Sequence, residues 1–150
     1  MMRTNSKCAL VTLGFLLATH AGLATAHTQA GALGTAAVAT DYYQVTCTDD
    51  GSGPPASLLV RVRDDAPVAA PIVSVLVHKG LLARNGSDPV DGDTGLSFVA
   101  VVNGGAGVYN VFVSKTAAGV ENYTLTLHCM SGLNGGGVHT GTTVTLRQNQ

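Results

Sequence analysis

Apolar and polar side chains alternate along much of the chain after residue 40, and this period of two predicts β-strands. The clearest example is the segment 107–129, GVYNVFVSKTAAGVENYTLTLHC. We interpret it as two strands joined by the turn KTAAG. In its second half, Tyr123, Leu125, Leu127 and Cys129 alternate with polar residues, so these four side chains are expected to face a core. The remaining strands are expected to pack around this hairpin.

The same alternation predicts further strands, separated by turn signals rich in Gly, Pro and Asp. They span residues 41–48, 57–64, 72–79, 96–103 and 138–147. Segment 72–79 is almost continuously apolar and is expected to be a central strand covered on both faces. Residues 80–95 contain several turn-forming pairs and are expected to be the longest loop. About seven strands without intervening helices predict an all-β domain over residues 41–150, an antiparallel β-sandwich of jelly-roll or immunoglobulin-like type.

The first 26 residues have the composition of a signal peptide. A basic start is followed by the apolar run 8–18 and by the small residues ATA at 24–26. We therefore predict that residues 1–26 are cleaved and that the mature chain begins at His27. Such a chain is periplasmic or secreted, with no membrane insertion after cleavage. Residues 27–40 are small, uncharged and rich in Gly and Ala, and are expected to form an extended N-terminal arm.

Cleavage would remove Cys8 and leave Cys47 and Cys129. An even pair of cysteines in an exported protein is interpreted as a disulfide. Both cysteines lie on the apolar faces of their predicted strands, as a bridge between two sheets requires. In the chain-entropy model, closing so long a loop stabilises the fold by about 4–5 kcal/mol.

Charge and catalytic motifs exclude several classes of function. Eight Lys and Arg residues against nine Asp and Glu residues give a formal net charge of −1. The basic residues are scattered, so no surface for nucleic acid or an anionic membrane is expected. No serine stands in a Gly-x-Ser-x-Gly motif, and the disulfide accounts for the two mature cysteines. We assign no catalytic residues and do not expect an enzyme.

Three stretches share a pattern of aromatic and alternating apolar residues. Residues 41–45 (DYYQV) open with an Asp followed by aromatics, 107–113 (GVYNVFV) follow Gly-x-Tyr-x-Val-x-Val, and 123–127 (YTLTL) follow Tyr-x-Leu. In these stretches the chain resembles the bacterial pre-peptidase C-terminal domain, a small β-sandwich module of secreted proteases and other exported proteins. The resemblance implies a non-catalytic module that binds or assists, with calcium sites in some relatives. Segment 72–79 lacks the acidic pattern of such domains, and the cysteine pair is not part of their usual motif.

Cleavage before His27 would place an α-amino group and an imidazole on the same residue, and together they form a bidentate chelate. Nitrogen donors of this kind suit copper. A second histidine would complete the site, and the candidates are His78, His128 and His139. We assign His27, His128 and His139 to a candidate copper site. In the alternative interpretation, cleavage merely leaves a histidine at the N-terminus and the others are ordinary surface residues.

A second candidate metal site lies in the turn-rich segment 80–95. Asp88, Asp91 and Asp93 bring several carboxylates into one loop, where carboxylate and carbonyl oxygens could hold calcium. The segment lacks the regularly spaced ligands and the terminal Glu of an EF-hand. The alternative is a solvated, turn-rich loop without a metal.

Polar side chains, many of them Thr, alternate through residues 122–128 and the last predicted strand. This face could dock a glycan or a protein edge, or it could be an ordinary solvated sheet face. We expect a non-catalytic binding or accessory module with an unknown protein or glycan partner. Two alternatives stay open. One is a periplasmic copper-binding protein that uses His27. The other is a surface or filament subunit that self-associates by strand exchange through residues 27–40.

Overall fold

The computed structural model describes residues 27–66 and 71–150, so the predicted signal peptide lies outside the described part of the chain. No helix within these two ranges is long and apolar enough to cross a membrane. A short 3-10 helix, η1 (Leu133–Gly135), precedes the last strand. The strands are β1 (His27–Leu33), β2 (Thr40–Thr48), β3 (Ser57–Asp65), β4 (Val73–Lys79), β5 (Leu82–Ser87), β6 (Ala100–Val102), β7 (Gly107–Lys115), β8 (Glu121–Met130) and β9 (Gly141–Gln148).

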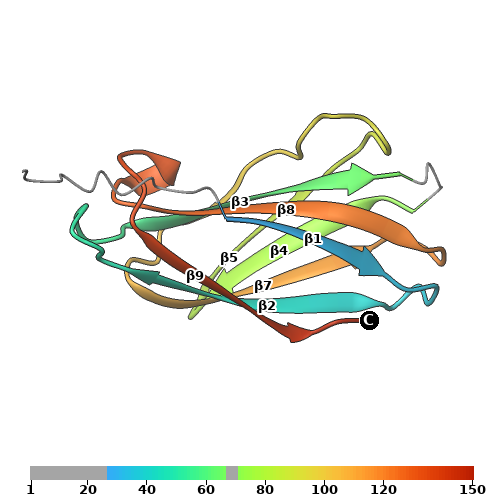
Figure 1. The fold of residues 1–150 in the computed structure, drawn as a ribbon, viewed down its shortest axis with the longest axis horizontal. Coiled ribbons are helices and arrows are strands. Elements are labelled where there is room, and N and C mark those ends of the chain that lie inside the picture. The colour runs from blue at the N-terminus through green and yellow to red at the C-terminus, as the bar shows by residue number, and fades with distance from the viewer. Residues whose placement is uncertain (1–26, 67–70) are drawn as a thin grey trace, which may run out of the picture.

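The strands form two sheets that pack face to face (Figure 1). One sheet has four strands in the order β1-β8-β3-β6, and the other has five in the order β5-β4-β7-β2-β9. Every pair of neighbouring strands is antiparallel. The prediction of an all-β antiparallel sandwich is confirmed, with nine strands in the described residues where about seven were expected.

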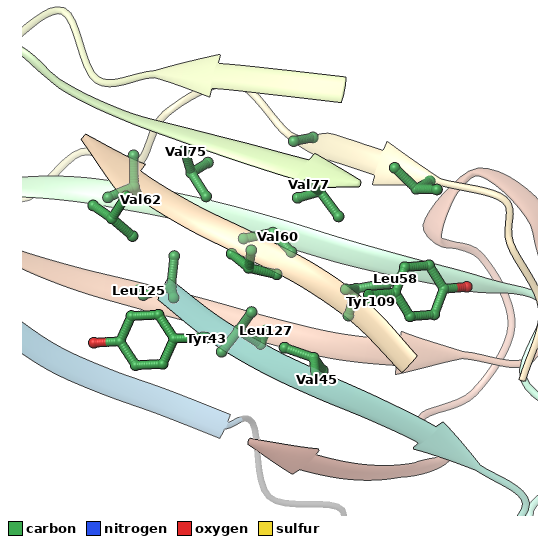
Figure 2. Packing of buried hydrophobic residues seen from close by; sticks show 14 of the residues in the cluster. Tyr43, Val45, Leu58, Val60, Val62, Val75, Val77, Tyr109, Leu125 and Leu127 are labelled. Carbon is green, nitrogen blue, oxygen red and sulfur yellow. The ribbon is translucent and has the colours of Figure 1, made fainter. Parts of the chain in front are cut away.

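The core lies between the sheets, where the inward positions of the alternating strands meet. Along β2, β7 and β8, buried residues alternate with more exposed ones. Val45 and Val77 from the five-stranded sheet meet Val60 and Leu127 from the four-stranded sheet in one buried cluster (Figure 2). Full burial of an apolar side chain of this size stabilises a fold by about 1.5–3 kcal/mol. The residues that alternate with them lie on the outer faces of the sheets and are mostly polar on β2 and β8.

A disulfide between Cys47 on β2 and Cys129 on β8 joins the two sheets, as predicted. Both cysteines occupy inward positions and are fully buried. Their Cα atoms lie 5.5 Å apart, within the range that a disulfide bridges. A structural disulfide is typical of proteins that fold in an oxidising compartment outside the cytoplasm.

The residues expected to form a free N-terminal arm instead begin the four-stranded sheet. β1 pairs with β8 in antiparallel register, from His27 opposite Leu127 to Leu33 opposite Glu121. Leu33 is fully buried in the core. The prediction of an arm over residues 27–40 was therefore wrong for β1. The low strand propensity of Gly and Ala is outweighed by backbone hydrogen bonds to β8 and by burial of Leu33.

The segment that follows β4 also differs from the prediction. Residues 82–87, expected in the longest loop, form β5, which pairs with β4 through a tight turn at Gly80. Gly80 has a φ of 58°, a left-handed conformation that glycine adopts without strain. Conversely, only residues 100–102 of the strand expected at 96–103 pair as β6. β4 is covered on one face rather than on both, because Leu76 points outward and is 42 % exposed.

Candidate functional site

Two histidines meet on the outer side of the four-stranded sheet. His128 occupies an outward position of β8, between the buried residues Leu127 and Cys129. His139 precedes β9 and forms an isolated antiparallel bridge with Met130 at the end of β8. The centroids of the two imidazole rings are 4.4 Å apart, and the ring planes are tilted by 57°. The structure thus brings together two of the three histidines assigned to a candidate copper site.

The two histidines line a shallow, open pocket of about 330 Å³, called the histidine pocket below. In the register of β3 and β8, Leu59 pairs with His128 and Arg61 pairs with Thr126, so these outward side chains are neighbours. The pocket therefore combines apolar surface with two imidazoles and one guanidinium. Its lining residues are Leu59, Arg61, Leu96, Thr126, His128, Met130 and His139.

His128 has a ring nitrogen without a hydrogen-bond partner among the described residues and a lowered pKa. Its Nδ1 atom is buried and has no hydrogen-bond partner among the described residues. Burial lowers the pKa of His128, and the nearby His139, His27 and Arg61 lower it further by repelling a positive charge. A lowered pKa keeps the imidazole neutral at neutral pH, and the neutral imidazole is the form that binds metal ions.

His27, the third candidate, lies beside the pocket but on a different face. It is the first residue of β1 and pairs with Leu127. Paired residues in an antiparallel sheet project from the same face, so the side chain of His27 starts on the inner side while that of His128 is outside. Accordingly, the side-chain ligand atoms of His27, His128 and His139 do not form a group within 4.8 Å in the part of the chain that is described. His78 lies on β4, in the other sheet.

The three aspartates of the candidate calcium loop have different environments. Asp88 is buried, and it accepts hydrogen bonds from the backbone N–H groups of Asp64 (2.9 Å) and Val90 (3.2 Å). Asp93 is exposed and accepts a hydrogen bond from the backbone of its own turn. Within residues 27–66 and 71–150, Asp88, Asp91 and Asp93 do not gather into one group of metal ligands.

Asp91 instead joins two acidic residues that the strand pattern did not single out. Carboxylate oxygens of Asp64, Asp91 and Glu121 all lie within 4.8 Å of one another, and we call these three residues the carboxylate cluster. Asp64 comes from an inward position of β3 and Glu121 from an inward position of β8. One sequence signal marks both residues. Asp64 and Glu121 are acidic residues at inward strand positions, where the alternation predicts an apolar residue.

The chain matches no protein-family model, no curated protein and no solved structure in the comparisons with known proteins. The resemblance to the pre-peptidase C-terminal domain therefore stays an expectation. Any function has to be inferred from the histidine pocket, the carboxylate cluster and the fold that positions them.

Proposed function

We propose that this chain is an exported, non-catalytic β-sandwich binding module that holds a transition-metal ion, copper in particular, in the histidine pocket. One observation carries the proposal: the ring centroids of His128 and His139 lie 4.4 Å apart in an open pocket. Export is supported by the buried disulfide between Cys47 and Cys129, a bond that persists in oxidising compartments.

The donor atoms around the pocket favour copper over calcium or magnesium. Imidazole nitrogens bind copper, zinc and nickel, whereas the hard cations prefer oxygen ligands. Met130, in the pocket wall, adds a thioether sulfur, which is a soft donor. Arg61 in the same wall repels a cation, so binding here depends on strong nitrogen donors rather than on general electrostatic attraction.

Cleavage before His27 would supply further nitrogen donors. A free α-amino group at the start of β1 would lie on the strand adjacent to the one that carries His128. The amine and the imidazole of His27 would then add to the two pocket imidazoles, a set that suits copper. Because the side chain of His27 starts on the inner face, this arrangement requires the terminal residue to rotate, and a chain terminus is the segment with the freedom to do so.

Copper titration of the mature chain tests the proposal. Protein that begins at His27, confirmed by its intact mass, would be titrated with Cu(II) against a chelator of known affinity. Replacing His128 or His139 by Ala is expected to weaken copper binding at least tenfold, which corresponds to about 1.4 kcal/mol. His78→Ala, on the other sheet, is the matched control and is expected to bind copper as the parent does. Equal affinity in the parent, His128→Ala and His139→Ala proteins would contradict the proposal.

A chain with one additional residue before His27 isolates the contribution of the α-amino group. If the amine is a ligand, the extended chain is expected to bind copper more weakly than the mature chain. His27→Ala, which keeps the amine but loses the imidazole, is also expected to bind more weakly than the mature chain. If all three bind equally, the pocket histidines form the site without the N-terminus. Competition with Zn(II) then measures the preference for copper.

A further inference from the structure

The carboxylate cluster lies at the opposite end of β8 from the histidine pocket. Glu121 begins β8, and His128 stands near its end, ~23 Å away at the rise of an extended strand. Asp64 comes from the neighbouring strand β3, and Asp91 comes from the segment between β5 and β6. The cluster therefore joins three parts of the chain and is independent of the histidines.

Two of these carboxylates are buried without the hydrogen bonds that a charge requires. Asp64 and Glu121 are both 0 % exposed. Both oxygens of Glu121 and the Oδ1 atom of Asp64 have no hydrogen-bond partner among the described residues. The Oδ2 atom of Asp64 accepts a hydrogen bond from the backbone N–H of Val73 at 2.8 Å. An ionised carboxylate that is buried and unpaired is strongly unfavourable. The unpaired oxygens of Asp64 and Glu121 therefore indicate that the cluster binds a positively charged group.

The neighbouring lysine does not fill that role. Lys115, on β7, is only 8 % exposed and is close enough to attract Glu121 electrostatically. However, its Nζ atom donates hydrogen bonds to the backbone carbonyl oxygens of Gly34 and Gly119. Lys115 therefore contributes charge near the cluster but leaves the oxygens of Glu121 without a hydrogen bond.

The segment that carries Asp91 is fastened to β3 on both sides of this residue. On one side, Asp88 accepts hydrogen bonds from the backbone N–H groups of Asp64 and Val90. On the other, the N–H of Gly92 donates to the carbonyl oxygen of Asp64 at 3.0 Å. These bonds hold Asp91 beside the two buried carboxylates before any ligand binds, which reduces the entropy lost on binding.

We propose that Asp64, Asp91 and Glu121 bind a divalent cation, with calcium as the best match. Calcium takes six to eight oxygen ligands in flexible geometry and accepts carboxylates through one or two oxygens. Magnesium demands a near-ideal octahedron and retains several waters, which a buried cluster accommodates poorly. Zinc and copper favour nitrogen and sulfur donors, which these side chains do not offer. The candidate calcium loop thus contributes Asp91, while two strands contribute the other ligands.

Calcium titration of chelator-treated mature protein tests the inference directly. Calorimetry is expected to give saturable binding of calcium and much weaker binding of magnesium. The melting temperature is expected to rise with calcium concentration, since an ion that binds only the folded state stabilises it. Absence of saturable binding at millimolar calcium overturns the inference.

Two conservative variants locate the site. Glu121→Gln and Asp64→Asn keep the shape of the side chain but remove its charge, so each is expected to weaken calcium binding at least tenfold. Asp93→Asn, exposed in the same segment as Asp91, is the matched control and is expected to retain the parental affinity. Circular dichroism establishes that each variant is folded before titration. If both Glu121→Gln and Asp64→Asn bind calcium with the parental affinity, the inference is overturned. The calcium titration of the parent tests the inference even if a variant does not fold.

A shared proton is the competing explanation of the carboxylate cluster, and the same proteins distinguish it. If protons alone satisfy the oxygens, calcium leaves the melting temperature of the parent unchanged while Asp64→Asn raises it, and that result overturns the cation site. Copper titration of Glu121→Gln is expected to match the parent. The calcium proposal for the carboxylate cluster and the copper proposal for the histidine pocket can therefore be tested independently.

Discussion

The phenolic oxygens of Tyr43 and Tyr123 lie 2.7 Å apart in the core and connect the two sheets. Tyr123 donates its hydroxyl proton to Oδ2 of Asp41 at 2.5 Å, so Tyr43 must donate to Tyr123. The other oxygen of Asp41 accepts a hydrogen bond from the backbone N–H of Gln150. Asp41 is thus a buried carboxylate with both oxygens satisfied, in contrast to Glu121. Burial, together with the hydrogen bond to Asp41, raises the pKa of Tyr123, which keeps the hydroxyl protonated as a donor.

Replacing Tyr123 by Phe is expected to destabilise the fold by about 1–3 kcal/mol, because the buried Asp41 carboxylate loses its donor. Tyr43→Phe leaves the bond between Tyr123 and Asp41 intact and is expected to cost less. Tyr42→Phe is the matched control, since the hydroxyl of Tyr42 bonds Asn110 on the outer face, where water can replace it. Urea denaturation measures the free energy of unfolding of all three variants. Equal losses for Tyr123→Phe and Tyr43→Phe would contradict the direction of donation.

Gly31 on β1 is expected to tolerate no side chain, because it lies against the ring of Tyr123. A Cβ atom at this position would lie 2.2 Å from Cζ of Tyr123, and the ring is held in place by Tyr43 and Asp41. Gly31→Ala is therefore expected to destabilise the protein by about 1–3 kcal/mol, as overpacking of a core typically does. The denaturation midpoint and hydrogen exchange in β1 measure the effect.

Gly34→Ala is the control for this substitution. A Cβ atom at Gly34 would meet its nearest neighbour, the backbone of Gln150, at 3.4 Å, which is an ordinary contact. Gly34→Ala is therefore expected to leave the denaturation midpoint nearly unchanged. If Gly31→Ala were as stable as Gly34→Ala, the close packing of β1 on Tyr123 would be refuted.

The inward face of β8 shows where sequence alone predicts a fold well. Tyr123, Leu125, Leu127 and Cys129 were predicted to face the core, and all four are buried. Clear alternation of apolar and polar residues is enough to identify the face. β1 was missed because its Gly and Ala side chains carry no such pattern, and its strand character comes from backbone pairing with β8. β5 was missed because the turn-forming pair Asn85-Gly86 lies within it.

The candidate sites depend on contacts between residues that are distant in sequence. His128 and His139 meet through the bridge at Met130, which the strand pattern does not indicate. Asp64 and Glu121 belong to strands that are neighbours only through the sheet order. Residue type identified the histidines and Asp91 as candidates, whereas Asp64 and Glu121 could have been found only by asking why acidic side chains occupy inward positions of strands.

Loss of the disulfide is expected to lower the free energy of unfolding by about 2–5 kcal/mol, the range for native disulfides in small exported domains. The double variant Cys47→Ala/Cys129→Ala removes the bond without leaving a free thiol. The parent under reducing conditions provides a second measurement of the same loss. Urea denaturation with a probe in each sheet checks both. An unchanged midpoint in the double variant would show that packing alone holds the sheets together.

The stability of the metal-free protein is expected to fall as the pH rises from about 4 to about 6. Burial raises the pKa of Asp64 to about 6, and the neighbouring Asp91, Glu121 and Asp88 carboxylates add to the rise. The unfolded state ionises near its usual pKa of 3.8 while the folded state keeps its proton, so ionisation favours unfolding throughout this window. The loss attributable to Asp64 is at most ~3 kcal/mol, and it is complete above the folded pKa.

Urea denaturation of chelator-treated protein across this pH range measures the effect as a difference between the parent and Asp64→Asn. The variant cannot ionise at this position, so its stability is expected to fall less steeply, whereas the control Asp93→Asn follows the parent. Saturating calcium is expected to reverse the trend in the parent, because the cation stabilises the ionised cluster. Parallel curves for the parent and Asp64→Asn would mean that Asp64 ionises normally in the folded state.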